Sequence, residues 1–423
     1  MARKMKDSGI EWIGEIPEGW EIVPVRSCFD EVRTKNTDGQ EQNALQFKSG
    51  NIISKANFNA NIDDYVADTI TNYTVVLPDT VMINGLNLNY DFKSLRVALV
   101  KEKGVITSAY LAIFPDRKKI FPQYATYLFK GYETKMAFHN MGAGIRKTLG
   151  YKEFKNQPLL LPSKEEQNKI SAYLDSKCSH IDIMLFKIRS SIEEYKKLKQ
   201  AVITQAVTKG VRGKREMKDS GVEWIGEIPK EWDILNLVAH TSMLTPMRDR
   251  PENLDGPIPW IRIEDFDGKY ISSSKASLGV SKETVRSMNL KIYPVGTILC
   301  TSSCIMGKCA IVSRELVSNQ RFIGIIPDQN TCENFLYYLM LSNSERMNYL
   351  ATGALQANLS RSSFEHLKVQ FPSYQEQKEI SDYLDTKCAE IDKLIAKKEQ
   401  LVKELESYKK SLIYEVVTGK REV

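Results

Sequence analysis

Residues 5–20 read "MKDSGIEWIGEIPEGW", and residues 217–232 read "MKDSGVEWIGEIPKEW". Thirteen of these sixteen positions are identical at an offset of 212 residues, and we name the two copies the opening segments. A second pair, the closing segments, consists of "PSKEEQNKISAYLDSKCSHID" (162–182) and "PSYQEQKEISDYLDTKCAEID" (372–392), with thirteen of twenty-one positions identical at an offset of 210. Because solenoid repeats run to roughly 20–50 residues, this period indicates a duplicated domain.

The stretches between these markers differ, since residues 21–141 and 233–351 share almost no visible identity. The chain has 423 residues and a mass of 48.2 kDa, with 42% hydrophobic and 26% charged residues, which suits two or three folded domains. Its last residues, "TGKREV", resemble the "GKREM" (213–217) that opens the second half. If the two ends meet in space, the molecule is a circular object with pseudo-twofold symmetry.

Each closing segment predicts the start of a long helix, with Ser163 or Ser373 as the N-cap residue after a proline. About 44 residues at 1.5 Å each give a rod of roughly 65 Å. Apolar residues recur at heptad positions a and d, which favours a coiled coil between the two copies, running antiparallel if a twofold relates them. The alternative is that each helix packs only on its own domain. The expected contacts of the helices are Leu174, Ile181, Leu185, Ile188, Ile192, Leu384, Ile391, Ile395, Val402 and Leu405.

The two variable bodies have mixed α and β patterns. Runs of β-branched residues bounded by turn residues predict strands within 73–84, 97–114, 291–303, 307–312 and 321–327, and helices are expected within 123–141 and 333–352. The fold class is therefore α+β (mixed α/β), with two globular domains separated by two long helices in an antiparallel coiled coil. The expected boundaries are 1–161 and 210–371 for the domains, and 162–209 and 372–423 for the helices.

The sequence shows no recognisable catalytic centre and no metal site. Its four histidines have no metal or triad spacing, and "CTSSCIMGKC" (300–309) lacks a fourth zinc ligand, so buried thiols are the expected interpretation. No phosphate-binding loop or dinucleotide fingerprint is present. Seven scattered cysteines and the lack of an apolar leader or of an ~18-residue apolar run favour a cytoplasmic protein without a membrane span.

Net charge is +6 and the pI is about 8.7, a mild bias towards polyanions that by itself does not establish nucleic-acid binding. Four of the five tryptophans lie in the opening segments, at Trp12, Trp20, Trp224 and Trp232. Tryptophans can stack on bases, but we expect these to anchor each opening segment on its domain.

Taken together, these motifs resemble the specificity subunit of type I restriction–modification systems over essentially the whole chain. The resemblance rests on the opening pattern "SGxEWIGEIPxxW" in both halves and on the closing pattern, seen as Phe154, Pro158, Pro162, Glu166, Gln167, Ile170, Tyr173, Leu174 and Asp175. A glycine-bearing loop precedes each closing segment, "GAGIRKTLGYKEF" (142–154) and "TGALQANLSRSSF" (352–364). The second copy lacks the first proline but keeps Pro372, Glu376 and Gln377.

The resemblance implies two target-recognition domains, each reading one half of a bipartite, interrupted, asymmetric target in double-stranded DNA. It also implies helices that space these domains and dock two methyltransferase (modification) subunits, with restriction (translocase–nuclease) subunits completing an enzyme for adenine methylation or restriction. The chain itself is then non-catalytic and binds no cofactor, and S-adenosylmethionine, ATP and Mg²⁺ belong to the partner subunits. Half-sites about 10 bp apart, one helical turn, are expected.

Base reading uses side chains with paired donors and acceptors, chiefly Arg, Lys, Asn and Gln. Such residues gather after an expected strand in the first body, "MINGLNLNYDFKSLR" (82–96), and in the loops before the closing segments. For any single one of them, a solvated surface residue is the plainer interpretation. The candidate DNA-binding residues are Asn84, Asn87, Asn89, Lys93, Arg96, Arg146, Lys147, Arg262, Lys308, Gln320, Arg321, Gln356, Asn358 and Arg361.

Two other interpretations of the sequence stay open. A non-catalytic coiled-coil adaptor would bind proteins through its two bodies and enrich no DNA motif. An autonomous enzyme such as a nuclease would cleave DNA as a purified chain with Mg²⁺, and the missing catalytic constellation argues against it.

Overall fold

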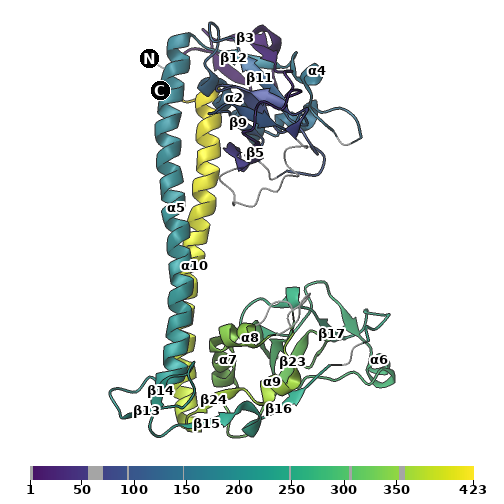
Figure 1. Ribbon diagram of the computed structural model, residues 1–423, viewed down its shortest axis with the longest axis vertical. Helices are drawn as coiled ribbons and strands as arrows, with labels where there is room; N and C mark the ends of the chain where they lie inside the picture. The colour runs from purple at the N-terminus through teal and green to yellow at the C-terminus, as the bar shows by residue number, and fades with distance from the viewer. Residues whose placement is uncertain are drawn as a thin grey trace. The chain divides into compact units, whose positions relative to one another are not determined.

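The computed structural model describes residues 3–55, 70–92, 95–145, 147–246, 249–303, 307–351 and 358–423. The chain divides into two compact units: unit 1 consists of residues 1–189 with 400–423, and unit 2 of residues 190–399. Unit 1 therefore contains both ends of the chain, and each unit takes one portion of each long helix (Figure 1).

Unit 1 is built on a four-stranded antiparallel sheet in the order β4-β11-β8-β9. Helix α2 packs against β9 and β8 and buries Tyr124, Leu128 and Phe129 in the main core. The sheet strands are β4 (Phe29–Glu31), β8 (Val81–Ile83), β9 (Val97–Leu99) and β11 (Leu111–Pro115), with β5 (Leu45–Lys48), β6 (Asn51–Ser54), β7 (Thr74–Val76) and β10 (Gly104–Ile106) in smaller pairs. The helices are α2 (Pro122–Thr134), α3 (Ala137–Met141) and α4 (Tyr151–Phe154).

Unit 2 repeats this plan with a five-stranded sheet in the order β16-β23-β20-β21-β18. Its strands are β16 (Thr241–Leu244), β18 (Tyr270–Ile271), β20 (Ile298–Thr301), β21 (Cys309–Val312) and β23 (Phe322–Pro327). A second sheet in the order β19-β17-β22 consists of β17 (Ile258–Ile261), β19 (Gly279–Val280) and β22 (Val317–Ser318). The helices are α6 (Lys282–Ser287), α7 (Glu333–Ser342), α8 (Ser344–Leu350) and α9 (Arg361–Glu365), and α7 packs against β20 and β21.

The strand that follows each opening segment pairs with the strand that precedes the closing segment of the same half. In unit 1, β3 (Glu21–Pro24) pairs with β12 (Pro158–Leu161), and in unit 2, β15 (Asp233–Asn236) pairs with β24 (Lys368–Phe371), both antiparallel. A hairpin precedes each of these strands: β1 (Met5–Asp7) with β2 (Glu15–Pro17), and β13 (Met217–Asp219) with β14 (Glu227–Pro229). The repeated sequence thus closes each unit around its variable body.

The predicted long helices are present. Helix α5 covers Lys164–Lys209 and α10 covers Tyr374–Val417. The predicted N-caps are confirmed, because the backbone N–H groups of Glu166 and Glu376 donate to Ser163 Oγ (3.3 Å) and Ser373 Oγ (3.4 Å).

The two helices run antiparallel within each unit. In unit 1, Lys409 Nζ lies 2.6 Å from Asp182 Oδ1, and in unit 2, Lys199 Nζ lies 2.6 Å from Asp392 Oδ2. Lys199 and Lys409 stand at equivalent heptad positions that are otherwise apolar, and each one pairs with an aspartate of the opposite helix. The coiled coil predicted from the sequence is therefore confirmed, with two related ion pairs at its polar positions.

The repeated motif has a physical explanation. Trp20 Nε1 donates to Glu166 Oε2 (2.9 Å) in unit 1, and Trp232 Nε1 donates to Glu376 Oε2 (3.0 Å) in unit 2. Both indoles are 1% exposed, so the predicted anchoring role is confirmed for these two tryptophans. Trp224, by contrast, is 43% exposed and stacks on a guanidinium group.

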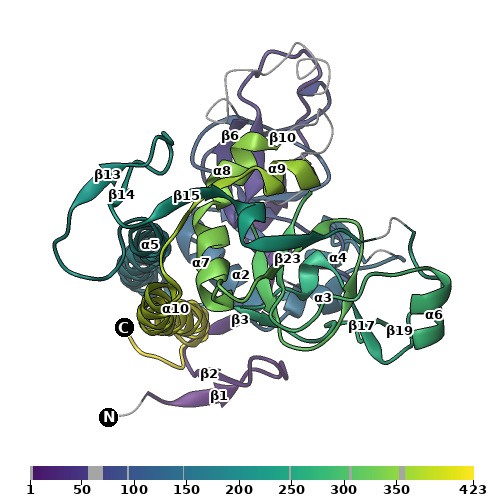
Figure 2. The same cartoon turned by 90° about the horizontal axis from the view of Figure 1, so that it is seen from below.

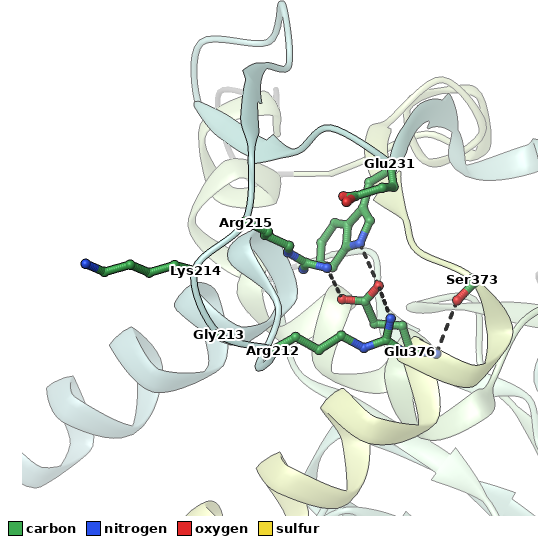
Figure 3. Close-up of a pocket in the computed structure, with 8 residues that line it drawn as sticks. Arg212, Gly213, Lys214, Arg215, Glu231, Ser373 and Glu376 are labelled. Carbon is green, nitrogen blue, oxygen red and sulfur yellow. Dashed lines mark hydrogen bonds and ion pairs between the residues drawn. The ribbon is translucent and has the colours of Figure 1, made fainter.

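In unit 2, the basic segment 212–215 lies beside the bonded pair of Trp232 and Glu376 (Figure 3). Arg215 Nη1 lies 2.6 Å from Glu376 Oε1, and Arg212 and Lys214 line the same cavity of about 390 Å³. In unit 1, Arg3 pairs with Glu166 in the same way. The carboxylate of each closing segment thus joins the indole at the end of the opening segment and the guanidinium group of the arginine two residues before that segment.

The glutamine that follows this glutamate in each closing segment fixes the loop before helix α2 in unit 1 and before helix α7 in unit 2. Gln167 Oε1 accepts from the backbone N–H of Phe121 (2.8 Å), and its amide nitrogen donates to the Lys119 carbonyl (3.1 Å). Gln377 makes the same bonds with Cys332 (2.8 Å) and Asn330 (3.1 Å). Both glutamine side chains are buried, so these backbone groups find partners away from water.

The ends of the chain meet within unit 1. Tyr414 Oη donates to the Trp12 carbonyl (2.7 Å), and Lys420 Nζ donates to the Ile13 carbonyl (2.6 Å). Figure 2 shows the C-terminal segment beside the hairpin β1–β2. The predicted meeting of the two ends is confirmed.

Candidate nucleic-acid interface

Two loops of unit 1, which the sequence predicts as separate clusters of candidate residues, lie together and form one surface. The Asn loop (84–92) follows β8, and the glycine loop (142–150) precedes α4. Leu149 N donates to the Gly85 carbonyl at 3.0 Å, which fastens the second loop to the end of the sheet strand. The structure thus brings the two predicted clusters of the first body together.

Further bonds join the tips of these loops. Leu88 N donates to the Lys147 carbonyl (3.2 Å), and Asn89 Nδ2 donates to the Ile145 carbonyl (3.1 Å). Asn89 therefore positions the glycine loop, in place of the free base-reading amide that the sequence predicts. Asn87 is exposed and adopts a positive φ of 54°, a conformation in which asparagine is enriched.

Glycine is required where the two loops touch. A Cβ atom at Gly85 would lie 2.4 Å from the Leu149 carbonyl oxygen. We expect Gly85→Ala to force the loops apart and to lower the stability of unit 1 by about 1–3 kcal/mol. Urea unfolding with hydrogen exchange of peptides from the two loops measures this. Gly19→Ala is the control, because nothing lies within 4 Å of a Cβ there. Unchanged protection of both loops in Gly85→Ala would contradict the shared surface.

Unit 2 has the same backbone arrangement in the same strand register. Asn84 N donates to the Arg96 carbonyl (2.8 Å), and Thr301 N donates to the Lys308 carbonyl (2.9 Å). Asn84 and Thr301 therefore occupy equivalent positions, since Val81 and Ile298, three residues before them, pair with equivalent positions of β11 and β23. Thr301 itself is fully buried.

The loop before the second closing segment docks in the same place. Leu359 N donates to the Ser302 carbonyl (2.9 Å), as Leu149 does to Gly85 in unit 1. Ser302 N in turn donates to the Arg321 carbonyl (2.8 Å), and Ser303 forms a bridge with Asn358. Three candidate side chains therefore come from segments that meet at the end of β20, and all three are exposed: Lys308, Arg321 and Asn358.

The assignment of Arg96 to DNA contact is corrected by the structure, because this side chain is only 1% exposed. Its guanidinium group donates to the carbonyls of Asn84 (2.8 Å), Leu86 (2.9 Å) and Asp91 (2.5 Å). Arg96 is thus an internal support of the Asn loop. Cationic residues after a strand give the same sequence pattern whether the side chain is buried beneath a loop or faces solvent.

Behind Arg96 lies a carboxyl group with a perturbed pKa. Burial raises the pKa of Glu133 from 4.5 to about 7, although the backbone N–H of Arg96 and its charge pull that pKa down. The folded state therefore binds the Glu133 proton more tightly than the unfolded chain does. The stability that this proton provides is complete below pH 4.5 and is lost as pH rises towards 7.

We expect Glu133→Gln to remove that pH dependence. The wild type loses on the order of 1–3 kcal/mol of unit 1 stability between pH 4.5 and 7 through this group, and the variant does not. Urea unfolding at pH 5 and pH 7.5, followed by hydrogen exchange of unit 1 peptides, measures the difference. Equal pH slopes for the two proteins would show that Glu133 keeps an ordinary pKa.

Other candidate residues lie outside these shared surfaces or outside the described ranges. Arg262 follows β17 and pairs with Glu264 (3.1 Å), and Arg361 opens α9 and pairs with Glu365 (2.7 Å). Gln320 is exposed directly before Arg321. The candidates that lie outside the described residues are Lys93, Arg146 and Gln356.

The expected contact residues of the helices vary in burial. Leu174, Leu185 and Ile181 are at most 6% exposed and belong to the core of unit 1, against which Val402 and Leu405 pack. In unit 2, Ile192, Leu384 and Ile391 are buried, while Ile395 is half-buried; Ile188 is likewise half-buried in unit 1.

Two exposed apolar side chains of the unit 1 surface, Ile145 and Tyr90, carry no signal in the sequence, where apolar residues predict burial. Ile145 is 95% exposed and Tyr90 is 73% exposed. Among the described residues, no three His, Cys, Asp or Glu side chains gather in a way that would hold a metal ion. No helix within the described ranges is long and apolar enough to cross a membrane.

Comparisons with known proteins agree with this architecture. Residues 233–404 match the family model of the type I restriction modification DNA specificity domain. A putative type I restriction enzyme MjaX specificity subunit from Methanocaldococcus jannaschii is 24% identical, over 96% of this chain and 95% of that one. The MjaIX specificity subunit of the same organism is 34% identical over 168 residues, 38% of each chain.

Solved structures share the fold at low identity. A chain from a study of complex assembly and conformational transition in the type I R-M system matches with a TM-score of 0.71 and 13% identity, over 96% of this chain and 99% of that one. The HsdS subunit from Thermoanaerobacter tengcongensis matches with a TM-score of 0.52 and 14% identity, over 99% and 100%. This chain is therefore similar to specificity subunits of type I restriction–modification systems, by the family model over residues 233–404 and in overall sequence and fold over nearly its whole length.

Proposed function

We propose that this chain is a specificity subunit that reads a bipartite, interrupted and asymmetric DNA target, with one half-site for each unit. The observation that carries the proposal is the pair of unlike surfaces on one backbone plan. Unit 1 presents Asn87 and Lys147 at the end of β8, whereas unit 2 presents Lys308 and Arg321 at the equivalent end of β20. Different donors and acceptors at the equivalent ends of the two sheets select different bases.

The two surfaces divide their residues between two tasks. Exposed lysines such as Lys147 and Lys308 suit phosphate contacts, which fix the position of the protein without reading sequence. Asn87 and Arg321 suit base edges, because amide and guanidinium groups pair with adenine and guanine respectively. The strands beneath them share one register in both units, so the side chains of the loops set the target choice of each half-site.

We further propose that the long helices dock two methyltransferase (modification) subunits, and that restriction subunits complete the enzyme. Apolar side chains on α5 and α10 remain exposed where the helices contact neither each other nor their domain. In unit 1, Phe186 is 73% exposed and Ile183 is 50% exposed, and in unit 2, Leu394 is 42% exposed and Tyr383 is 40% exposed. Exposed apolar groups on a rigid helix are typical of protein interfaces.

Phe186 is the most exposed of these side chains. Phe186→Glu is expected to weaken binding of the modification subunit about 30-fold or more, the effect of losing a central aromatic anchor. Titration of the purified subunits by light scattering or calorimetry measures this. The matched control is Ala396→Glu, which adds the same charge at the position 210 residues later, where the side chain offers little apolar surface. Equal affinities for the Phe186→Glu variant and the wild type would exclude this docking face.

In the proposed complex, S-adenosylmethionine, ATP and Mg²⁺ belong to the partner subunits, and adenine methylation or restriction takes place there. The test is methylome sequencing of cells that express this chain with its modification subunit. We expect one asymmetric motif in two parts, with half-sites about 10 bp apart from centre to centre. A single continuous short motif, or the absence of any motif, would contradict the proposal.

A further inference from the structure

Ile145 is presented to solvent in a way that is unusual for an aliphatic residue. Its side chain is 95% exposed, the largest exposed fraction among the large hydrophobic side chains of the described residues. It lies at the tip of the glycine loop, directly before two cationic positions in the sequence, Arg146 and Lys147. A fully exposed isoleucine gains nothing from folding, so its place on a candidate recognition surface needs an explanation.

The backbone around Ile145 is fixed. Lys147 N donates to the Gly144 carbonyl (3.0 Å), which places Ile145 at a corner of a tight turn. Ala143 and Thr148 exchange two backbone hydrogen bonds, of 3.1 and 2.9 Å, at the base of that turn. The side chain is therefore held out by a closed hydrogen-bonded loop.

A second loop supports the turn from the side. The carbonyl of Ile145 accepts from Asn89 Nδ2 (3.1 Å), and the carbonyl of Lys147 accepts from Leu88 N (3.2 Å). A Cβ atom at Gly142 would lie 2.7 Å from Leu88 Cδ1, so the two loops are in close contact. Because both loops hold the turn, the isoleucine has a defined position relative to Asn87.

The surroundings of Ile145 suit the major groove of DNA. Two loops side by side form a broad surface, which matches a groove about 12 Å wide better than the minor groove of about 6 Å. Exposed Asn87 supplies an amide for base edges, and Lys147 supplies a charge for phosphate. The apolar group that base pairs present in the major groove is the C5-methyl of thymine.

We propose that Ile145 is a specificity-determining residue, which contacts the C5-methyl group of a thymine in the half-site read by unit 1. The inference rests on the proposed function and adds to it a chemical requirement on the target. The half-site of unit 1 contains an A·T pair whose thymine methyl faces the tip of the glycine loop. The Ile145 side chain is then buried against that methyl group only when DNA is bound.

The test uses the assembled complex of this chain with its modification subunits and the target motif from methylome sequencing. Each thymine of the unit 1 half-site is replaced in turn by deoxyuridine, which removes only the methyl group. We expect one position at which the wild-type complex loses about fourfold in affinity, the value for one apolar carbon group returned to water. The Ile145→Ala complex binds thymine and deoxyuridine there within about 1.5-fold of each other.

Leu77→Ala is the matched control, since Leu77 is an aliphatic residue of the same unit, 48% exposed, in the turn before β8 rather than after it. This variant keeps the full deoxyuridine penalty. A unit 1 half-site without thymine, no penalty at any thymine in the wild type, or an unchanged penalty in Ile145→Ala would each overturn the inference while the bipartite target stands. A complex that selects no motif at all would instead overturn the proposed function.

Discussion

Trp232→Ala is expected to lower the free energy of unfolding of unit 2 by about 3–5 kcal/mol, the cost of removing a large buried aromatic side chain. The indole is 1% exposed and belongs to the core of unit 2. Its Nε1–H also donates to Glu376, whose carboxylate pairs with Arg215, and the Arg215 guanidinium carbon lies 5.1 Å from the indole centroid. The substitution therefore removes apolar burial and the hydrogen bond that joins the opening segment to α10.

Trp224→Ala supplies the matched control, because Trp224 belongs to the same opening segment but is 43% exposed. Trp224→Ala removes mainly the stacking of Arg346 on the indole, where the guanidinium carbon lies 3.9 Å from the ring centroid. We expect this substitution to lower the free energy of unfolding by about 1 kcal/mol. Hydrogen exchange of unit 2 peptides in increasing urea compares the variants, with unit 1 peptides as the internal reference. Equal effects of the two substitutions would refute the anchoring role of Trp232.

Arg96→Met is expected to lower the stability of unit 1 by about 3–5 kcal/mol, because it removes a buried charge from its partners. Three backbone carbonyls, those of Asn84, Leu86 and Asp91, lose their donor. An unpaired buried carbonyl is costly, so the Asn loop is expected to rearrange. We therefore expect the base preference of the proposed unit 1 half-site to weaken, although the Arg96 side chain is itself buried.

The readout for Arg96→Met is twofold: hydrogen exchange of peptides from the Asn loop, and the methylation motif of the assembled complex. Arg33→Met is the control, since the Arg33 side chain is 79% exposed and pairs with Glu31 on the surface of the same unit. Such a pair contributes about 0–1 kcal/mol. If Arg96→Met kept a sharp first half-site and native protection of the loop, the supporting role of Arg96 would be wrong.

The architecture was predictable because its repeated residues act at helix ends and in cores. The heptad pattern of α5 and α10 identifies their buried positions, and the serine after each proline identifies where they begin. Two of the lysines that interrupt the pattern, Lys199 and Lys409, have equivalent partners on the opposite helix. Periodicity survives in a sequence whenever a long element buries one face.

The recognition surface was less predictable, because loop residues with the same chemistry have opposite uses. Arg96 and Lys308 occupy equivalent positions, yet Arg96 is buried under its loop and Lys308 is exposed. Asn89 has its amide occupied by the Ile145 carbonyl, whereas Asn87, two residues earlier, is exposed. Which side chain faces inward depends on contacts between the Asn loop and the glycine loop, which lie more than fifty residues apart in the chain. The sequence of either loop alone does not predict such contacts.

The most direct test of two independent readers compares methylation motifs from three assembled complexes: the wild type, an Asn87→Ala/Lys147→Ala variant of unit 1, and a Lys308→Ala/Arg321→Ala variant of unit 2. We predict a two-part motif for the wild type. Each variant is predicted to relax one half of the motif, a different half for each, and to leave the other half sharp, because a lost base-reading contact costs about 1–3 kcal/mol at its own position. Relaxation of both halves by one variant, or of the same half by both, would contradict the account.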